Sequence, residues 1–189
     1  VEPTGRKIEV PSLTTFAGTP NLVNGGWVHQ ADPRGGLVVE VIGRSYSVNE
    51  QGASLVGTGE LIGLSSNLAV LRDCDEQLRC GMSVVDRVTG AVRQLDTDLP
   101  PEGLRPMWSW GWGFCAVRAI SPNGEICVAL MSEGYLDSFI ERLVFIDLQS
   151  GSITLGPTVL WPEVVWSPDA RFAFYVDHEH ESELVAYDR

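Results

Sequence analysis

The amino-acid sequence predicts an all-β domain, on the evidence of its turn-forming residues, its apolar content and the spacing of its short apolar runs. The chain of 189 residues contains 20 glycines and 11 prolines, and 44% of its residues are apolar. Disordered chains lack that apolar content, and long helices do not tolerate so many helix-breaking residues. A chain of this length can bury a sufficient core as one domain without a metal or a disulfide.

A repeated turn sequence divides the chain. Residues 84–90 and 145–151 share two apolar residues, an aspartate, a small hydroxyl residue and a final glycine, and weaker copies end at Gly5 and Gly52. The glycines stand at positions 5, 52, 90 and 151, and their mean separation of about 49 residues lies in the range of propeller blades. In each copy the aspartate can hydrogen-bond the turn, and the glycine supplies a positive φ before the next strand.

A second turn sequence lies between runs of alternating apolar residues. Residues 121–124 read Ser-Pro-Asn-Gly, and residues 167–170 read Ser-Pro-Asp-Ala. Proline presets the φ of such a turn, and asparagine or aspartate tolerates the left-handed conformation. Ala170 stands where the other copy has Gly124, so a departure from ideal turn geometry is expected there.

Taken in order, the elements are short strands, each bounded by turn residues. Strands are predicted at residues 6–10, 36–42, 44–49, 53–57, 67–73, 81–87, 91–95, 114–120, 125–131, 142–148, 152–156, 164–167, 171–177 and 183–188. No helical stripe longer than two turns competes with them. Units of four such strands predict a β-propeller of four-stranded antiparallel blades, with about four blades present.

The repeat also predicts blade boundaries. The repeat glycines divide the chain into blades of residues 6–52, 53–90, 91–151 and 152–189. Strand 6–10 is expected to complete the last blade beside residues 183–188, which would remove exposed edges. A closed ring of four blades and part of a ring of six to eight blades both fit. Since the chain begins with Val1, it is expected to be a segment of a longer precursor, with room for an upstream membrane anchor.

These turns resemble those of bacterial WD-repeat-like and TolB-type propellers, whose blades carry a Ser-Pro-Asp-Gly turn between inner strands and an Asp-x-x-Thr-Gly turn between outer strands. Residues 121–124 and 167–169 match the first turn, and residues 86–90 and 147–151 match the second. Residues 74–87 are similar to uncharacterised actinobacterial envelope proteins built on such propellers. The resemblance implies a propeller fold and an exported setting, and it implies no shared catalytic residues.

The four cysteines form two local pairs. Cys74 and Cys80 flank a five-residue loop between two predicted antiparallel strands, and Cys115 and Cys127 lie on the strands flanking the turn at 121–124. Local disulfides are therefore expected, and they would place the protein in an extracellular or cell-envelope setting. Four buried thiols in a cytosolic protein are the alternative. The lack of a Cys-x-x-Cys spacing argues against zinc.

A ligand site is predicted in the insertion at residues 96–113. Trp108, Trp110 and Trp112 alternate, so in an extended segment their three indoles share one face, with Arg105 in the same insertion. Such a row could stack on a sugar or grip a partner loop. Packing of the row between blades is the alternative. Replacing Trp110 with alanine separates the two, because only the packing role predicts loss of folding.

Charge limits the classes of partner. The chain has 25 acidic and 13 basic residues, a net charge of −12. This field repels nucleic-acid phosphates and anionic lipid headgroups, and no run of 18 apolar residues predicts a membrane span. The acidic residues at 73–76 and the Asp-His-Glu-His-Glu run at 177–181 are interpreted as solvated loops, so neither a metal nor a cofactor is predicted.

No nucleophile, dinucleotide or acid–base motif is found, so no catalytic residue is predicted. The sequence favours a non-enzymatic extracytoplasmic β-propeller scaffold that binds a protein, peptide or cell-wall ligand through loops on one face. One alternative is a propeller-type glycan hydrolase or lyase with carboxylates at the central channel. Another is a purely structural domain attached to a separate catalytic or membrane region.

Overall fold

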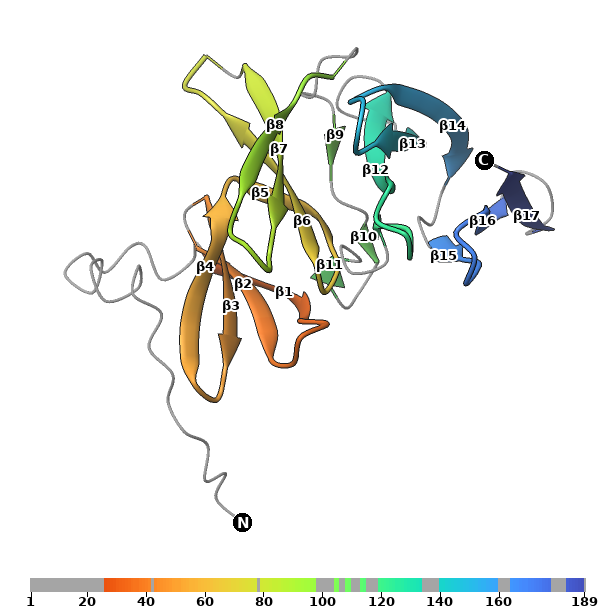
Figure 1. Cartoon of the computed structure of the whole chain (residues 1–189). Helices are drawn as coiled ribbons and strands as arrows, with labels where there is room; N and C mark the ends of the chain where they lie inside the picture. Colours follow the sequence, from red (N-terminus) through yellow and green to blue (C-terminus); the bar gives the residue numbers. More distant parts are fainter. Residues whose placement is uncertain are drawn as a thin grey trace.

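The computed structural model describes residues 26–41, 43–77, 79–97, 104–105, 108–109, 113–114, 119–133, 140–159, 164–177 and 183–188. Over these residues every strand pairing is antiparallel. The strands gather into separate sheets that follow one another along the chain (Figure 1).

The first two sheets are four-stranded meanders whose strands pair in chain order. The first sheet contains β1 (Gly26–Ala31), β2 (Leu37–Val41), β3 (Arg44–Asn49) and β4 (Gly52–Thr58). The second contains β5 (Glu60–Leu64), β6 (Leu68–Cys74), β7 (Cys80–Asp86) and β8 (Val92–Leu95). β4 and β8 are therefore the outermost strands of their sheets.

The third and fourth sheets continue the pattern. The third pairs β9 (Leu104–Arg105), β12 (Ile126–Glu133), β13 (Ile140–Asp147) and β14 (Ile153–Val159), and the fourth pairs β15 (Val164–Trp166), β16 (Phe172–Asp177) and β17 (Glu183–Asp188). A ribbon of β10 (Trp108–Ser109) and β11 (Gly113–Phe114) precedes β12. The described chain is thus a β-propeller of four antiparallel blades, which confirms the predicted fold class.

The sheet boundaries differ from those predicted. β1 and β5 begin their sheets where no strand is predicted, and β4, β8 and β14 pair with the strand before the repeat glycine rather than joining the next blade. The reason is that the turn from aspartate to glycine is a tight hairpin, so both its arms belong to one sheet. Residues 6–10 and 115–118 lie outside the described residues, so the closing strand stays a prediction.

The outer hairpin turns have the chemistry expected from the repeat. The carboxylates of Asp86 and Asp147 each accept hydrogen bonds from the N–H groups two and three residues later, at 2.7–2.9 Å. Hydrogen bonds from Thr89 and then Val88 hold the pKa of Asp86 below its ordinary value. Gly90 and Gly151 then take positive φ angles of 76° and 85°.

The inner turns are also held by one side chain. The Ser121 Oγ accepts a hydrogen bond from the Ile126 N–H at 3.0 Å, and the Ser167 Oγ accepts one from Phe172 at 2.9 Å. Ala170 adopts a left-handed φ of 60° and still donates its N–H to the Ser167 carbonyl at 2.9 Å. The departure from glycine therefore does not open this turn.

The core lies between the sheets, and both faces of the second sheet contribute to it. The face toward the first sheet is packed with Val38, Leu61, Ala69, Leu71 and Val85. The opposite face joins the larger cluster with the third sheet through Ile62, Val70, Met82, Val84 and Leu95. Close approach there requires a glycine, since a Cβ at Gly63 would lie 2.7 Å from the Cys127 Sγ.

The predicted disulfide between Cys74 and Cys80 is present and joins directly opposed residues of β6 and β7. Replacing Cys74 with serine is expected to lower the free energy of unfolding by about 2 kcal/mol, because the cross-link restricts the unfolded chain. Urea denaturation with and without reductant measures this. Reductant should destabilise the wild type by the same amount and leave the variant unchanged; equal stability of the reduced and oxidised wild type would contradict the expectation.

Candidate functional site

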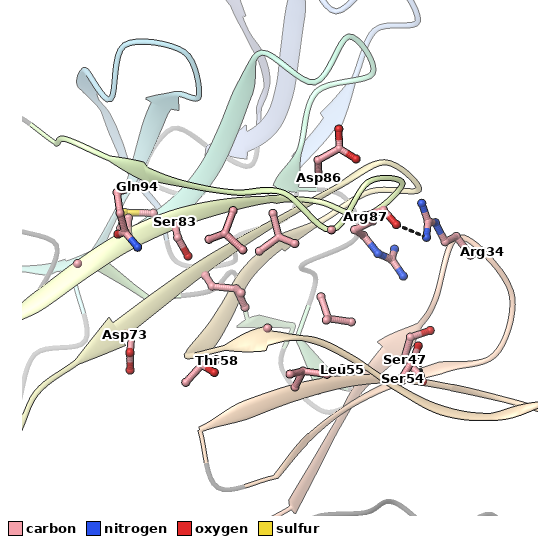
Figure 2. A pocket seen from close by; sticks show the side chains of 18 of the residues that line it. Arg34, Ser47, Ser54, Leu55, Thr58, Asp73, Ser83, Asp86, Arg87 and Gln94 are labelled. Carbon is pink, nitrogen blue, oxygen red and sulfur yellow. Dashed lines mark hydrogen bonds between the residues drawn. The ribbon is translucent and has the colours of Figure 1, made fainter.

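A cavity of about 700 Å³ lies between the outer strands of the first sheet and the face of the second (Figure 2). Its lining combines apolar side chains with hydroxyl, amide and charged groups. The first sheet contributes Ser47, Asn49, Ser54, Leu55, Val56, Gly57 and Thr58, and the second contributes Leu71, Asp73, Gly81, Met82, Ser83, Val85, Asp86, Val92 and Gln94, with Arg34, Arg87 and Gly90 from turns.

The two sheets that form the cavity are joined by a buried ion pair. Asp32, in the turn after β1, lies 2.6 Å from the guanidinium of Arg87, in the outer turn of the second sheet. The Asp32 side chain is 0% exposed and that of Arg87 is 4% exposed. Ser47 donates its hydroxyl to the same Asp32 oxygen at 2.5 Å, and Arg87 also donates to the Ser65 carbonyl at 2.7 Å. We call the pair of Asp32 and Arg87 the latch.

The latch is charged. Burial by itself would raise the pKa of Asp32, but hydrogen bonds from Arg87, Ser47 and the Arg34 N–H, together with the charge of Arg87, hold the pKa below its ordinary value. A buried carboxylate is tolerated only when it is paired and hydrogen-bonded, and both conditions hold here. Asp32 therefore fixes the first sheet to the second through a short, desolvated contact.

Arg34 lies at the same end of the cavity. Its guanidinium donates to the Ser66 carbonyl at 2.5 Å and to the Arg87 carbonyl at 2.7 Å. Figure 2 shows Arg34 and Arg87 together at one end of the cavity, with Asp73 and Thr58 toward the other end. The two arginines tie turns of both sheets together at this end of the cavity.

A second, smaller cavity of about 240 Å³ lies between the third and fourth sheets. Its walls include Phe145, Trp166 and Tyr187, and the rings of Phe145 and Tyr187 stack with centroids 4.0 Å apart. Stacking of this kind joins the last two sheets through aromatic packing rather than through an ion pair. The larger cavity has the more polar lining, because it includes charged, hydroxyl and amide side chains from both sheets.

The predicted ligand residues fall largely outside the described structure. Trp110 and Trp112 lie outside the described residues, and for Trp108 and Arg105 only the backbone is described, in β10 and β9. The tryptophan row stays a prediction.

Cys127 is a free, fully buried thiol rather than half of a disulfide, and its predicted partner Cys115 lies outside the described residues. The physical reason is direction: on β12 the Cys127 side chain points toward Gly63 of the neighbouring sheet. Burial raises the pKa of the Cys127 thiol to about 12.

Cys127 is therefore expected to resist alkylation by iodoacetamide at about pH 8 in the folded protein, because the thiolate is the reactive form. In urea the same cysteine should react. Peptide mapping by mass spectrometry locates the modification. Equal labelling of Cys127 in the folded and unfolded protein would contradict its burial.

In the acidic loop between β6 and β7, the Asp75 carboxylate is hydrogen-bonded to other residues of the loop. The Asp75 carboxylate accepts hydrogen bonds from the Gln77 and Arg79 N–H groups and from the Arg79 guanidinium, at 2.8–3.0 Å. In the described part of the chain, no three histidine, cysteine, aspartate or glutamate side chains gather as metal ligands would. The histidines at 178 and 180 lie outside that part. No helix of the described residues is both long and apolar enough to cross a membrane.

The latch is not among the predicted features, although the sequence carries a pattern for it. Residues 32–35 read Asp-Pro-Arg-Gly, a third copy of the inner turn, in which Gly35 donates to the Asp32 carbonyl at 2.8 Å as Gly124 does to Ser121. Asp32 thus stands where the other copies have serine. An aspartate at that position, with an arginine following the repeat aspartate at 86, is the pattern that could have predicted the pair.

Successive antiparallel meanders with a cavity between two of them define the class of this protein as a β-propeller. No family model and no curated protein matches the sequence. Among solved structures, TolB from Acinetobacter baumannii is similar, with 12% identity, a TM-score of 0.49, and coverage of 94% of this chain and 42% of that one. Hydrazine synthase from Kuenenia stuttgartiensis has 16% identity, a TM-score of 0.34, and coverage of 92% and 58%.

The chain spans less than two thirds of the length of either similar structure. At this level of similarity neither protein's activity carries over. TolB, which gives its name to the predicted propeller type, is among the similar structures. The narrower resemblance to actinobacterial envelope proteins stays a prediction.

Proposed function

We propose that this chain is a non-enzymatic β-propeller module that binds a protein or peptide ligand in the cavity between its first two sheets. The cavity of about 700 Å³ carries the proposal. Ligand sites are commonly about 300 to 1,000 Å³ in size and combine an apolar lining with a few well-placed polar groups. Here Val56, Leu71 and Val85 supply apolar surface, and Ser83 and Gln94 supply polar groups.

Rigidity of the cavity supports binding. The latch and the Arg34 contacts fix the two sheets against each other, so the protein loses less conformational entropy when a ligand binds. Less ordering on binding leaves more of the contact free energy as affinity. The arrangement suits a site that is formed before the ligand arrives.

An extracellular or cell-envelope location is part of the proposal. The disulfide between Cys74 and Cys80 supports it, because disulfides persist in oxidising compartments. The net charge of −12 favours neutral or basic partners over nucleic acids and anionic membranes. A cell-wall ligand remains the alternative occupant of the same cavity.

Binding of the purified domain to an envelope extract from its own source cells tests the proposal. The wild type should bind saturably, and Gln94→Trp, which fills the cavity from the exposed strand β8, should weaken binding at least tenfold. Leu155→Trp is the matched control, because Leu155 is exposed on β14, the outermost strand of the third sheet. Equal binding by all three proteins, with unchanged thermal unfolding, would rule out this cavity as the site.

A further inference from the structure

The wall of the cavity on the first sheet includes the outer edge of β4, beside Ser47 and Asn49 of β3. Among the described residues, β4 is outermost in its sheet and pairs with β3 only. Five consecutive residues of β4, from 54 to 58, line the cavity. A bulge at Val56 interrupts the alternation, but the pairing with β3 places Ser54 and Gly57 on one face and Leu55 and Thr58 on the other, so the space touches both faces of β4 and lies along its outer edge. The unpaired backbone groups of β4 therefore border the cavity.

The opposite wall is the face of a sheet. On this face Leu71 of β6, Ser83 of β7 and Gln94 of β8 stand opposite one another in one row across the strands. Asp73 and Gly81 form the next row, and Val85 and Val92 the row on the other side. Lining residues here alternate along each strand, apart from Met82 and Asp86 of β7, which is the pattern of a face and not of an edge.

A strand edge beside a sheet face fits an extended peptide. The five residues of β4 span roughly 17 Å, enough to pair with a peptide of about five residues. The peptide backbone would hydrogen-bond to β4, and every second side chain would lie on the face of the second sheet. On that face, a peptide side chain beside Val85 and Val92 should be apolar, one beside Ser83 should be small or carry a hydroxyl, and one beside Asp73 should be basic.

We infer that the cavity binds an extended, neutral to basic peptide segment of another protein, added as a fifth strand along the edge of β4. The inference rests on the proposed function and specifies its ligand and binding mode. Charge agrees with it at one end of the cavity, where Asp73 attracts a basic residue, whereas Arg34 and Arg87 at the other end favour a neutral one. Val92 and Leu55, 61% and 57% exposed, flank the space and would be covered by the added strand.

The test uses three synthetic peptides and fluorescence anisotropy. The parent peptide alternates valine and threonine over seven residues and carries a single lysine at one end. In the second and third peptides, one or the other alternate set of amide nitrogens is methylated. Only one set of N–H groups in an added strand points toward β4, so methylation of that set should weaken binding at least tenfold and methylation of the other set less than threefold.

Two protein variants locate the peptide. Leu55→Arg places a positive charge on β4 beside the cavity and should weaken binding of the basic parent peptide at least fivefold. Leu155→Arg makes the same change at an exposed leucine of β14 and should leave binding unchanged. Thermal unfolding of both variants checks that they fold, and the comparison of methylated peptides on the wild type does not depend on either variant.

The outcomes separate the inference from the proposed function. Equal binding of the two methylated peptides would overturn strand addition, while a loss with Leu55→Arg alone would still support the cavity as a peptide site. Absence of parent-peptide binding up to millimolar concentration would overturn the inference. In that case, saturable envelope binding that Gln94→Trp weakens would leave the proposed function standing. Equal effects of Leu55→Arg and Leu155→Arg would also overturn the inference.

Discussion

Replacing Arg87 with leucine is expected to lower the free energy of unfolding by about 3 to 5 kcal/mol, because it leaves the buried carboxylate of Asp32 without its cation. The substitution also removes the hydrogen bond to the Ser65 carbonyl, which holds the outer turn of the second sheet. Chemical denaturation at neutral pH measures the loss. A change below about 1 kcal/mol, the range of exposed ion pairs, would show that the latch is not a desolvated contact.

A double variant provides the control. The second and third sheets have residues at the equivalent positions. Ser65 begins the inner turn of the second sheet as Asp32 begins that of the first, and Leu148 follows the repeat aspartate of the third sheet as Arg87 does in the second. Combining Asp32→Ser with Arg87→Leu therefore installs residues that the fold already uses at these positions. The double variant should recover at least half of the stability lost by Arg87→Leu, since replacing both ions removes the unpaired charge. A double variant as unstable as the single one would contradict this explanation.

The pH dependence of the latch follows from Asp32. Its pKa lies below the ordinary value of 3.8, so its stabilising contribution is fully present above that value and is lost as the pH falls through the folded-state pKa. The stability difference between the wild type and Asp32→Asn should therefore stay constant from neutral pH to about 5 and shrink below 3.8. Denaturation curves over this range measure it. A stability difference between the wild type and Asp32→Asn that grows as the pH falls would contradict this prediction.

Gly151→Ala is expected to lower the free energy of unfolding by about 3 kcal/mol or more, through left-handed strain and a steric clash together. Gly151 has a φ of 85°, and a Cβ there would lie 2.0 Å from the backbone oxygen of Asp96. That oxygen follows β8, so the outer turn of the third sheet packs directly on the end of the second. Backbone cannot move aside as a flexible side chain can, so the clash must displace the sheets.

Gly90→Ala separates the clash from the strain. Gly90 occupies the same place in the outer turn of the second sheet, with a φ of 76°, but no atom lies within 4 Å of a Cβ built there. Its substitution should cost only the strain, about 1 to 2 kcal/mol. Thermal or urea unfolding of the two variants gives the comparison. Equal losses would mean that the sheets do not meet closely at Gly151.

The parts of the fold that the sequence predicts are those encoded by neighbouring residues. Asp86 and Asp147 bond their own turns, and Gly90 and Gly151 sit a fixed distance later, so the hairpins are local and the repeat reveals them. Ser121 and Ser167 work in the same way for the inner turns. Strands between such turns follow directly, which is why most predicted strands are found.

The cavity and the latch depend on contacts between distant residues, and the substitutions in the turn copies that mark Asp32 and Arg87 do not show which two turns meet. Asp32 and Arg87 are 55 residues apart, and Arg87 occupies a position of the repeat that holds leucine in the next copy. The blade boundaries are misplaced for a related reason: a repeat gives the period but not which strand begins each unit. β1 and β5 are missed because their partners, rather than their own alternation, define them as strands.

Hydrogen–deuterium exchange on the domain, free and saturated with the envelope fraction, tests most directly whether the cavity between the first two sheets is the binding site. Bound ligand should slow exchange at β4, residues 52–58, and at residues 81–85 of β7, because both border the cavity. Protection confined to residues 104–114, with β4 unchanged, would contradict the account and place the site at the tryptophan row.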